Sequence, residues 1–150
     1  MLRKIFLFVL CLLPWFVTSF LPIDYNYYQK LDLPFFAPPS SFYGIAWGIV
    51  YVLISLNISK LLSNYKFRDV SFSYKLTLII NYLFNQSYVI FAFILKNNFL
   101  GFIACLGTFI SSLFLYEETS KYQSKKLLIP YILLGLFATI LSLSIYFLNI

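Results

Sequence analysis

The sequence predicts an all-α membrane protein: a bundle of five transmembrane helices in a single domain over residues 1–150. Hydrophobic residues make up 61% of the chain and charged residues only 11%, whereas a soluble domain carries about 25% charged residues. Five apolar runs are long enough to cross the hydrocarbon core of a bilayer, which takes about 20 helical residues. These runs are continuous rather than alternating, so they do not fit a transmembrane β-barrel.

The first predicted element is a membrane span that follows Arg3 and Lys4. Its basic start and apolar middle resemble a secretory signal peptide, but its end, FVTSFLP, lacks a small-x-small cleavage site. We therefore expect an uncleaved span. The five predicted spans occupy residues 5–21, 42–62, 72–95, 98–116 and 127–148.

The long loop before the second span, residues 22–41, is rich in proline and aromatic residues. Loops of this length often serve as lids or binding elements. Pro38 and Pro39 have a fixed φ and no N–H group, which suits the entry to a helix. We expect a stiff lead-in to the second span, with Ser40 or Ser41 as its cap.

The third span carries neutral polar residues at membrane depth. Asn81 and Asn85 are four residues apart and share a helix face, with Tyr88 near it. Two interpretations stay open. These amides either form hydrogen bonds to neighbouring helices, as is common in membrane bundles, or point into a pocket and hold the polar atoms of a ligand.

Small residues recur at four-residue spacing in the second, fourth and fifth spans. Such pairs let helices approach closely, and we interpret all three as helix-packing positions. The pairs are Gly44 and Gly48, Gly107 and Ser111, and Gly135 and Thr139. Pro130 lies near the start of the fifth span, where a proline is tolerated.

The basic residues predict the orientation of the bundle. Only Lys30 and Lys96 fall on one side of the predicted spans. By the positive-inside rule, the other side faces the cytoplasm, so the N-terminus lies inside and the C-terminus outside. That side holds Arg3, Lys4, Lys60, Lys66, Arg68, Lys75, Lys121, Lys125 and Lys126.

The residue types present argue against several classes of function. The chain has no histidine, so a zinc site is not expected and the commonest haem ligand is missing. Cys11 and Cys105 lie inside apolar runs and read as small buried hydrophobes. No ionisable group lies deep in a span, which argues against ion coupling and acid–base catalysis. The charge pattern does not suggest nucleic-acid binding, and we expect neither catalytic nor metal-ligating residues.

Three stretches together resemble the TspO/MBR family, the tryptophan-rich sensory proteins and benzodiazepine-receptor-like translocator proteins. They are YYQKLDLPFFAPPSSFYGIAWGIVYVLISL, INYLFNQSYVIF and LLIPYILLGLFATILSLSIYFLN. They match the family's patterns in order and over nearly the whole chain. The resemblance implies a five-helix bundle, a homodimer and a pocket that opens toward the loop between the first two spans.

The resemblance also implies ligands and site residues. Family members bind tetrapyrroles such as protoporphyrin and haem, and synthetic isoquinoline carboxamide or benzodiazepine ligands. We therefore expect a receptor for planar hydrophobic molecules that requires no cofactor. We expect it in a bacterial cytoplasmic membrane, in contact with lipid. Tyr27 and Tyr28 are expected near the top of the pocket. The stiff loop is expected to hold Phe35 and Phe36 either at the membrane interface or over the top of the pocket. The ligand-binding residues implied are Tyr28, Pro38, Trp47, Asn81, Asn85, Tyr88, Leu134 and Ala138.

One position departs from the family pattern. Leu134 stands where the family has a second pocket tryptophan. Some bacterial members are thought to degrade porphyrin with light through their pocket tryptophans, and leucine has no oxidisable ring. The departure leaves binding in place and weighs against an enzyme. Light-dependent porphyrin breakdown and porphyrin or lipid transport are the alternative functions.

Overall fold

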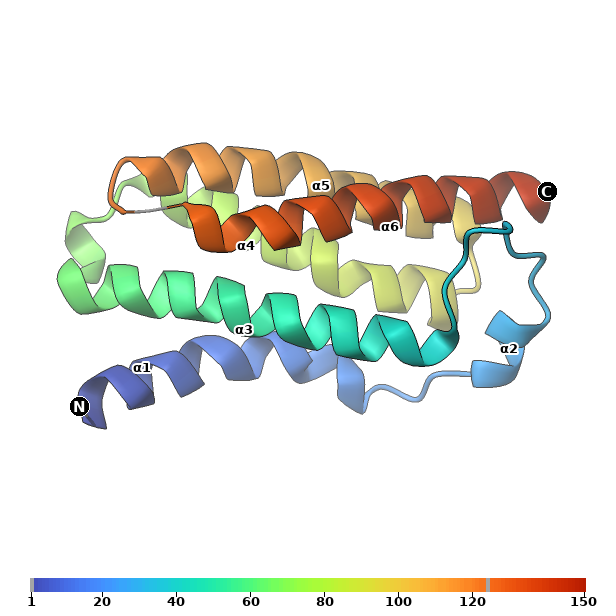
Figure 1. Cartoon of the computed structure of the whole chain (residues 1–150), viewed down its shortest axis with the longest axis horizontal. Coiled ribbons are helices and arrows are strands. Elements are labelled where there is room, and N and C mark those ends of the chain that lie inside the picture. The colour runs from blue at the N-terminus through green and yellow to red at the C-terminus, as the bar shows by residue number, and fades with distance from the viewer. Residues whose placement is uncertain (1, 124) are drawn as a thin grey trace.

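A computed structural model describes residues 2–123 and 125–150, and this part of the chain is helical with no strand (Figure 1). Five long helices form the bundle, and a short helix, α2 (Tyr25–Gln29), lies in the loop between the first two. The long helices are α1 (Leu2–Leu12), α3 (Ser40–Asn64), α4 (Phe72–Val89), α5 (Asn98–Ser120) and α6 (Ile129–Leu148).

Five helical stretches are long and apolar enough to cross a membrane, in agreement with the five predicted spans. They cover Leu2–Phe20, Ser40–Asn64, Phe72–Ile94, Asn98–Ser120 and Lys126–Leu148. The largest difference is at the end of the fourth, which runs to Ser120 instead of residue 116. Its last residues are polar and still helical, so this helix extends past the end of its apolar run. The chain is an integral membrane protein.

The first span is not one continuous α-helix. The α-helix ends at Leu12 and continues as a 3₁₀-helix, η1 (Leu13–Phe20). Pro14 explains the change, because it has no N–H for the α-helical hydrogen bond and its ring crowds the preceding turn. The span therefore stays helical while its geometry tightens, and it turns Trp15 and Thr18 into the bundle, where both are buried.

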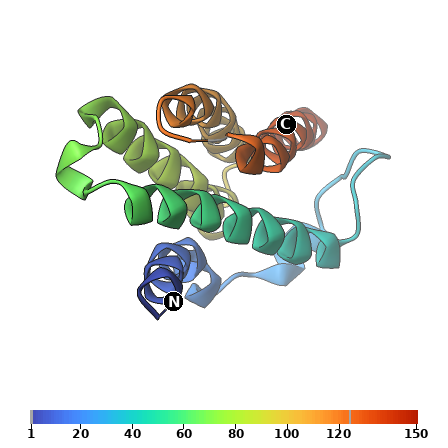
Figure 2. The same ribbon diagram turned by 60° about the vertical axis from the view of Figure 1, so that its left-hand side comes forward.

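The helices pack in a ring. α5 lies between α4 and α6, α3 contacts α6, and α1 packs mainly along α3, while η1 reaches α4. Figure 2 shows α1 and α3 below the other three long helices. The buried core lies between the long helices and includes Ile54 and Tyr131, neither of which has any exposed surface.

Two expectations about local structure were wrong. Helix α3 begins at Ser40 with Pro39 at the N-cap position and no side-chain cap bond, so neither Ser40 nor Ser41 caps it. Proline can take this place because it needs no partner for an N–H group. Gly44 and Gly48 do not pack against a helix, since a Cβ atom added at either would meet nothing within 4 Å.

The other two small-residue pairs do mark close packing. A Cβ atom at Gly107 would overlap the ring of Phe84 on α4, and one at Gly135 would lie 3.5 Å from the Cα atom of Phe109 on α5. The contact of α5 with α4 therefore depends on glycine at position 107, whereas a Cβ atom at position 135 would only make an ordinary van der Waals contact with α5.

The two ends of the bundle differ in charge. The N-terminus, the α3–α4 turn and the α5–α6 turn lie together at one end, and α2, the α4–α5 turn and the C-terminus lie at the other (Figure 1). The nine basic residues grouped by the positive-inside rule belong to the first end, whereas Lys30 and Lys96 belong to the second. The fold thus supports the grouping, and the direction of insertion stays a prediction.

Candidate functional site

A cavity of about 360 Å³ lies inside the bundle, at the end that carries α2. It is more than twice the size of a roughly 150 Å³ apolar cavity that binds benzene, so it has room for a larger ring system. Each of the five spans contributes to its wall. Thr18, Tyr51, Asn85, Thr108 and Ser142 represent the spans in chain order.

Aromatic rings form one side of this cavity. The ring centroids of Trp47 and Tyr51 lie 5.7 Å apart, and both residues line the cavity. Tyr51 in turn stacks on the buried Trp15 with centroids 5.4 Å apart. Tyr131 meets Trp47 edge-on at 6.3 Å. Because Tyr51 and Tyr131 both contact it, the half-buried indole of Trp47 is held in place at the wall of the cavity.

Asn85 lines the cavity and also ties three spans together. Its Oδ1 accepts hydrogen bonds from the hydroxyl of Tyr51 at 2.8 Å and from the Nε2 of Gln86 at 3.1 Å. Its Nδ2 donates to the hydroxyl of Tyr131 at 3.4 Å. The side chain is therefore held at the edge of the cavity with its polar atoms already engaged.

Asn81 lies deeper, with no exposed surface. Its Oδ1 accepts a hydrogen bond from the hydroxyl of Tyr131 at 2.8 Å, and its Nδ2 donates to the carbonyl of Thr108 and the hydroxyl of Ser111 at 3.1 and 2.9 Å. The sequence leaves two interpretations open, hydrogen bonds to neighbouring helices or contact with a ligand. The contacts of Asn81 agree with the first, because its amide forms hydrogen bonds to neighbouring helices and does not line the cavity.

The structure brings together most of the residues that the sequence suggested, without testing their role in binding. Five of them line the cavity: Tyr28, Trp47, Asn85, Tyr88 and Ala138. Pro38, Asn81 and Leu134 do not. Leu134 packs against the buried core instead, and Pro38 lies in the loop that leads into α3.

For the two loop phenylalanines the sequence leaves two places open, the membrane interface and the top of the pocket. Neither Phe35 nor Phe36 is part of the cavity wall. Phe35 is fully exposed, and Phe36 meets Phe137 of α6 edge-on at 6.4 Å. The loop therefore rests on the outer surface of α6 through Phe36, because α6 offers an aromatic partner there.

Phe93 lines the cavity although sequence spacing gives no hint of it. Residues five apart in an α-helix are about 140° apart around its axis. The end of the third span is instead a π-helix, Ile90–Ile94, closed by a 2.8 Å bond from the N–H of Leu95 to the carbonyl of Ile90. This wider turn brings Phe93 onto the side of Tyr88, and their centroids lie 5.9 Å apart.

Helix α6 contributes a row of lining residues of which the sequence suggested only one. Gly135, Ala138, Ser142 and Ile145 all face the cavity. Their spacing of three and four residues is the helical signal that would have found them once Ala138 was chosen. The hydroxyl of Ser142 lies 3.3 Å from the thiol of Cys105, which also lines the cavity.

Among the described residues, no charged side chain lines the cavity. The wall offers aromatic faces, hydroxyl groups, one amide and a thiol. Such a wall suits a largely uncharged ligand that is held by ring contacts and a few hydrogen bonds.

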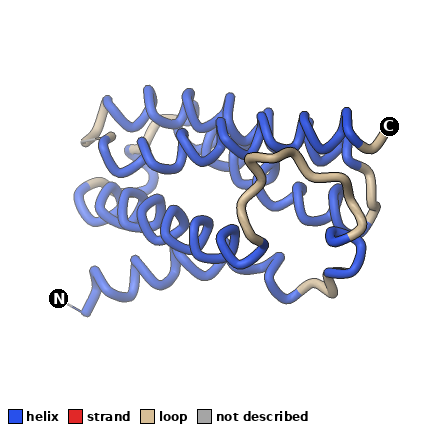
Figure 3. The backbone as a smooth tube through the Cα atoms, turned by 45° about the vertical axis from the view of Figure 1, so that its right-hand side comes forward, coloured by secondary structure: helices blue, strands red, loops and turns tan. Residues whose placement is uncertain are grey.

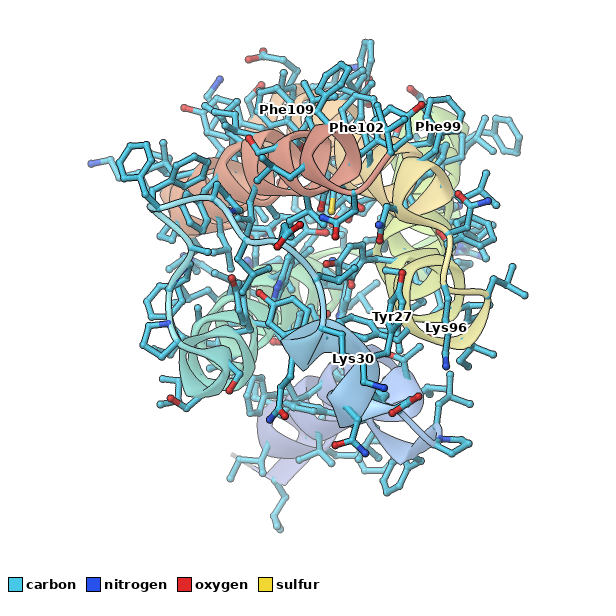
Figure 4. The ribbon with its side chains drawn as sticks, turned by 90° about the vertical axis from the view of Figure 1, so that its right-hand side faces the viewer. Tyr27, Lys30, Lys96, Phe99, Phe102 and Phe109 are labelled. Atoms are coloured by element: carbon cyan, nitrogen blue, oxygen red, sulfur yellow. The ribbon has the colours of Figure 1, made fainter. Side chains whose placement is uncertain are left out.

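The loop before α3 lies at the end of the bundle that carries the C-terminus (Figure 3). Three groups of contacts hold it there. The Nζ of Lys96 donates to Asp24 at 2.9 Å, and the hydroxyl of Tyr27 lies 3.2 Å from the carbonyl of Lys96; Figure 4 shows Tyr27 and Lys96 side by side. Asp32 and Asn149 exchange two hydrogen bonds of 2.9 Å through the Asp32 backbone. The hydroxyl of Tyr28 donates to that of Tyr43 on α3 at 3.1 Å.

The Asp24–Lys96 contact predicts that the loop loosens in acid. The hydrogen bond from Lys96 holds the pKa of the Asp24 carboxyl below its ordinary value. A lowered pKa means that the contact stabilises the loop above the ordinary value and is lost as the pH falls through the lowered one. The protection of the amides in residues 22–39, measured as the exchange rate of an unstructured peptide divided by the observed rate at the same pH, is therefore expected to fall on acidification. Asp24→Asn should show lower protection at neutral pH and lose this pH response, whereas a wild type whose protection does not change with pH would contradict the prediction.

Comparison with known proteins identifies the family of the chain. The model of the TspO/MBR family matches residues 5–148. The chain is 38% identical over 138 residues to tryptophan-rich protein TspO of Bacillus cereus, covering 90% of this chain and 89% of that protein. It is 34% identical over 131 residues to the uncharacterized membrane protein YtaB of Bacillus subtilis, covering 86% and 84%.

A more distant relative also matches most of the chain. Tryptophan-rich protein TspO of Archaeoglobus fulgidus is 28% identical over 130 residues, which span 83% of this chain and 80% of that protein. The similarity thus extends over all five spans and is not limited to one motif. With a family model that matches nearly its full length, this five-helix membrane protein belongs to the TspO/MBR family.

Proposed function

We propose that this protein is a membrane receptor that binds planar hydrophobic ligands, tetrapyrroles such as protoporphyrin and haem in particular, in the cavity beneath the loop between the first two spans. The observation that carries the proposal is the cavity of about 360 Å³ with an aromatic side and an uncharged wall. The family resemblance supplies the ligand class. The geometry supports it through size, ring faces and polarity.

The physical match rests on three features of the wall. The face of Trp47 offers a stacking surface that is already rigid, so binding orders few rotatable bonds. The lack of charge makes burial of an apolar ring favourable and burial of a charged group costly. The carboxylates of a tetrapyrrole therefore have to stay at the mouth of the cavity, beside the loop.

The orientation proposed for the receptor follows from charge. The end with nine basic residues faces the cytoplasm, and the end with the cavity and loop faces outward. A cysteine introduced at Lys30 should then react with a membrane-impermeant maleimide in intact cells, and one at Lys66 should not.

Titration of the detergent-solubilised protein with metal-free protoporphyrin and with haem tests the proposal. Because the chain has no histidine, we expect both porphyrins to bind with similar affinity, to quench tryptophan fluorescence and to raise the thermal unfolding midpoint. Failure of both to bind would contradict the proposal. A low-spin, histidine-like haem spectrum would contradict the expected mode of binding.

A further inference from the structure

We propose that Gly44 and Gly48 of α3 determine the size of the ring system that the cavity accepts, because their missing side chains leave room for the ligand against the bare helix backbone. The inference rests on the proposed binding function and names the residues that would control its specificity.

The backbone does not require glycine at either position. Both lie inside the 25-residue helix α3, and no described glycine has a positive φ. Glycine in the interior of a helix is less favourable than alanine, because it loses more backbone freedom on folding. Where a residue goes against this local preference, we expect another feature of the structure to explain its presence.

Packing does not require glycine there either. A Cβ atom added at Gly44 or Gly48 would meet nothing within 4 Å. The contrast with two other glycines is clear, because a Cβ atom at Gly101 would lie 3.1 Å from that of Ala92, and one at Gly107 would overlap the ring of Phe84. The two glycines of α3 border open space instead.

That open space is the cavity itself, since both glycines line it. They alternate with Trp47 and Tyr51 at positions i, i+3, i+4 and i+7, so the four residues share one face of α3. Gly135 and Ala138 of α6 also line the cavity and are likewise small. Side chains added at Gly44 or Gly48 would therefore take up volume next to the aromatic rings that a ligand is expected to contact.

Substitution by residues of increasing size tests the inference. Gly48→Ala and Gly44→Ala are expected to raise the unfolding midpoint without ligand and to lower protoporphyrin affinity severalfold. Gly48→Leu is expected to lower that affinity at least tenfold. The loss should be smaller for a two-ring isoquinoline probe, because a smaller ligand needs less of the space. An altered fold alone would not produce this dependence on ligand size.

Two control variants separate added bulk from general damage. Ile45→Phe adds bulk at a side chain that is 66% exposed on the outer face, and should bind as the wild type does. Gly107→Ala should lower the unfolding midpoint, in contrast to the α3 alanine variants. Should Gly48→Leu fail to fold, the alanine variants decide. Unchanged protoporphyrin affinity in the α3 variants, or an equal loss for both probes, would overturn this inference alone. A wild type that binds neither probe would overturn the proposed function as well.

Discussion

Replacing Asn81 with alanine is expected to lower the free energy of unfolding by about 2 kcal/mol. The substitution removes the acceptor of the Tyr131 hydroxyl and the donor to Thr108 and Ser111, all within a part of the bundle closed to lipid and water. A buried polar group left without its partner costs about 1–3 kcal/mol. Single interhelical hydrogen bonds in membranes average only about 0.6 kcal/mol, but Asn81 makes three such bonds at once.

Unfolding by a denaturing detergent, followed by circular dichroism, measures this loss. Ser144→Ala is a suitable control, because the hydroxyl of Ser144 only bonds the carbonyl of Ile140 in its own helix, and we expect a change within about 0.5 kcal/mol. If Asn81→Ala proved no less stable than Ser144→Ala, the hydrogen bonds would not join α4, α5 and α6 as described.

The positions of Asn81 and Asn85 in the structure show which features of this site the sequence predicts and which it does not. Their spacing correctly places them on one face of the third span. It does not show that the hydroxyl of Tyr131, from a helix 50 residues along the chain, lies between them. That hydroxyl accepts a hydrogen bond from Asn85 and donates one to Asn81, and only Asn85 lines the cavity.

The apolar runs predict the five spans well, because length and hydropathy are enough to define a membrane helix. They do not predict changes in helix type. The 3₁₀ segment after Leu12 has a visible cause in Pro14, whereas the π-helix of Ile90–Ile94 contains neither proline nor glycine. Phe93 was missed for that reason.

The loop contacts lie beyond sequence reasoning for another reason. Asp24 and Lys96 are 72 residues apart, and Asp32 and Asn149 are 117 apart. Nothing in local spacing pairs them, because the pairing depends on which helix ends the bundle brings together. The prolines predict a stiff loop, and this stays a prediction. The hydrogen bonds that tie the loop to the bundle involve Asn149 after α6, the α4–α5 turn and Tyr43 of α3.

Trp47→Ala is expected to weaken protoporphyrin binding about 30-fold. Stacking between aromatic rings contributes about 0.5–1.5 kcal/mol beyond the burial of apolar area, and the smaller side chain also buries less of that area. A combined loss of about 2 kcal/mol corresponds to this change in affinity. Trp47→Phe keeps a ring at the same place and should lose much less. Since Trp47 also contacts Tyr51 and Tyr131, the unfolding midpoint without ligand must be measured for both variants.

Fluorescence gives a second, independent readout of the same substitution. The chain has two tryptophans, and Tyr51 lies between the rings of Trp15 and Trp47 as the neighbour of both. Porphyrin in the cavity should therefore quench Trp47 more strongly, and the quenching that remains in Trp47→Phe reports on Trp15. If Trp47→Ala kept wild-type affinity, the aromatic side of the cavity would not be where the ring lies, since no ligand can lose a stacking partner without a loss of binding energy.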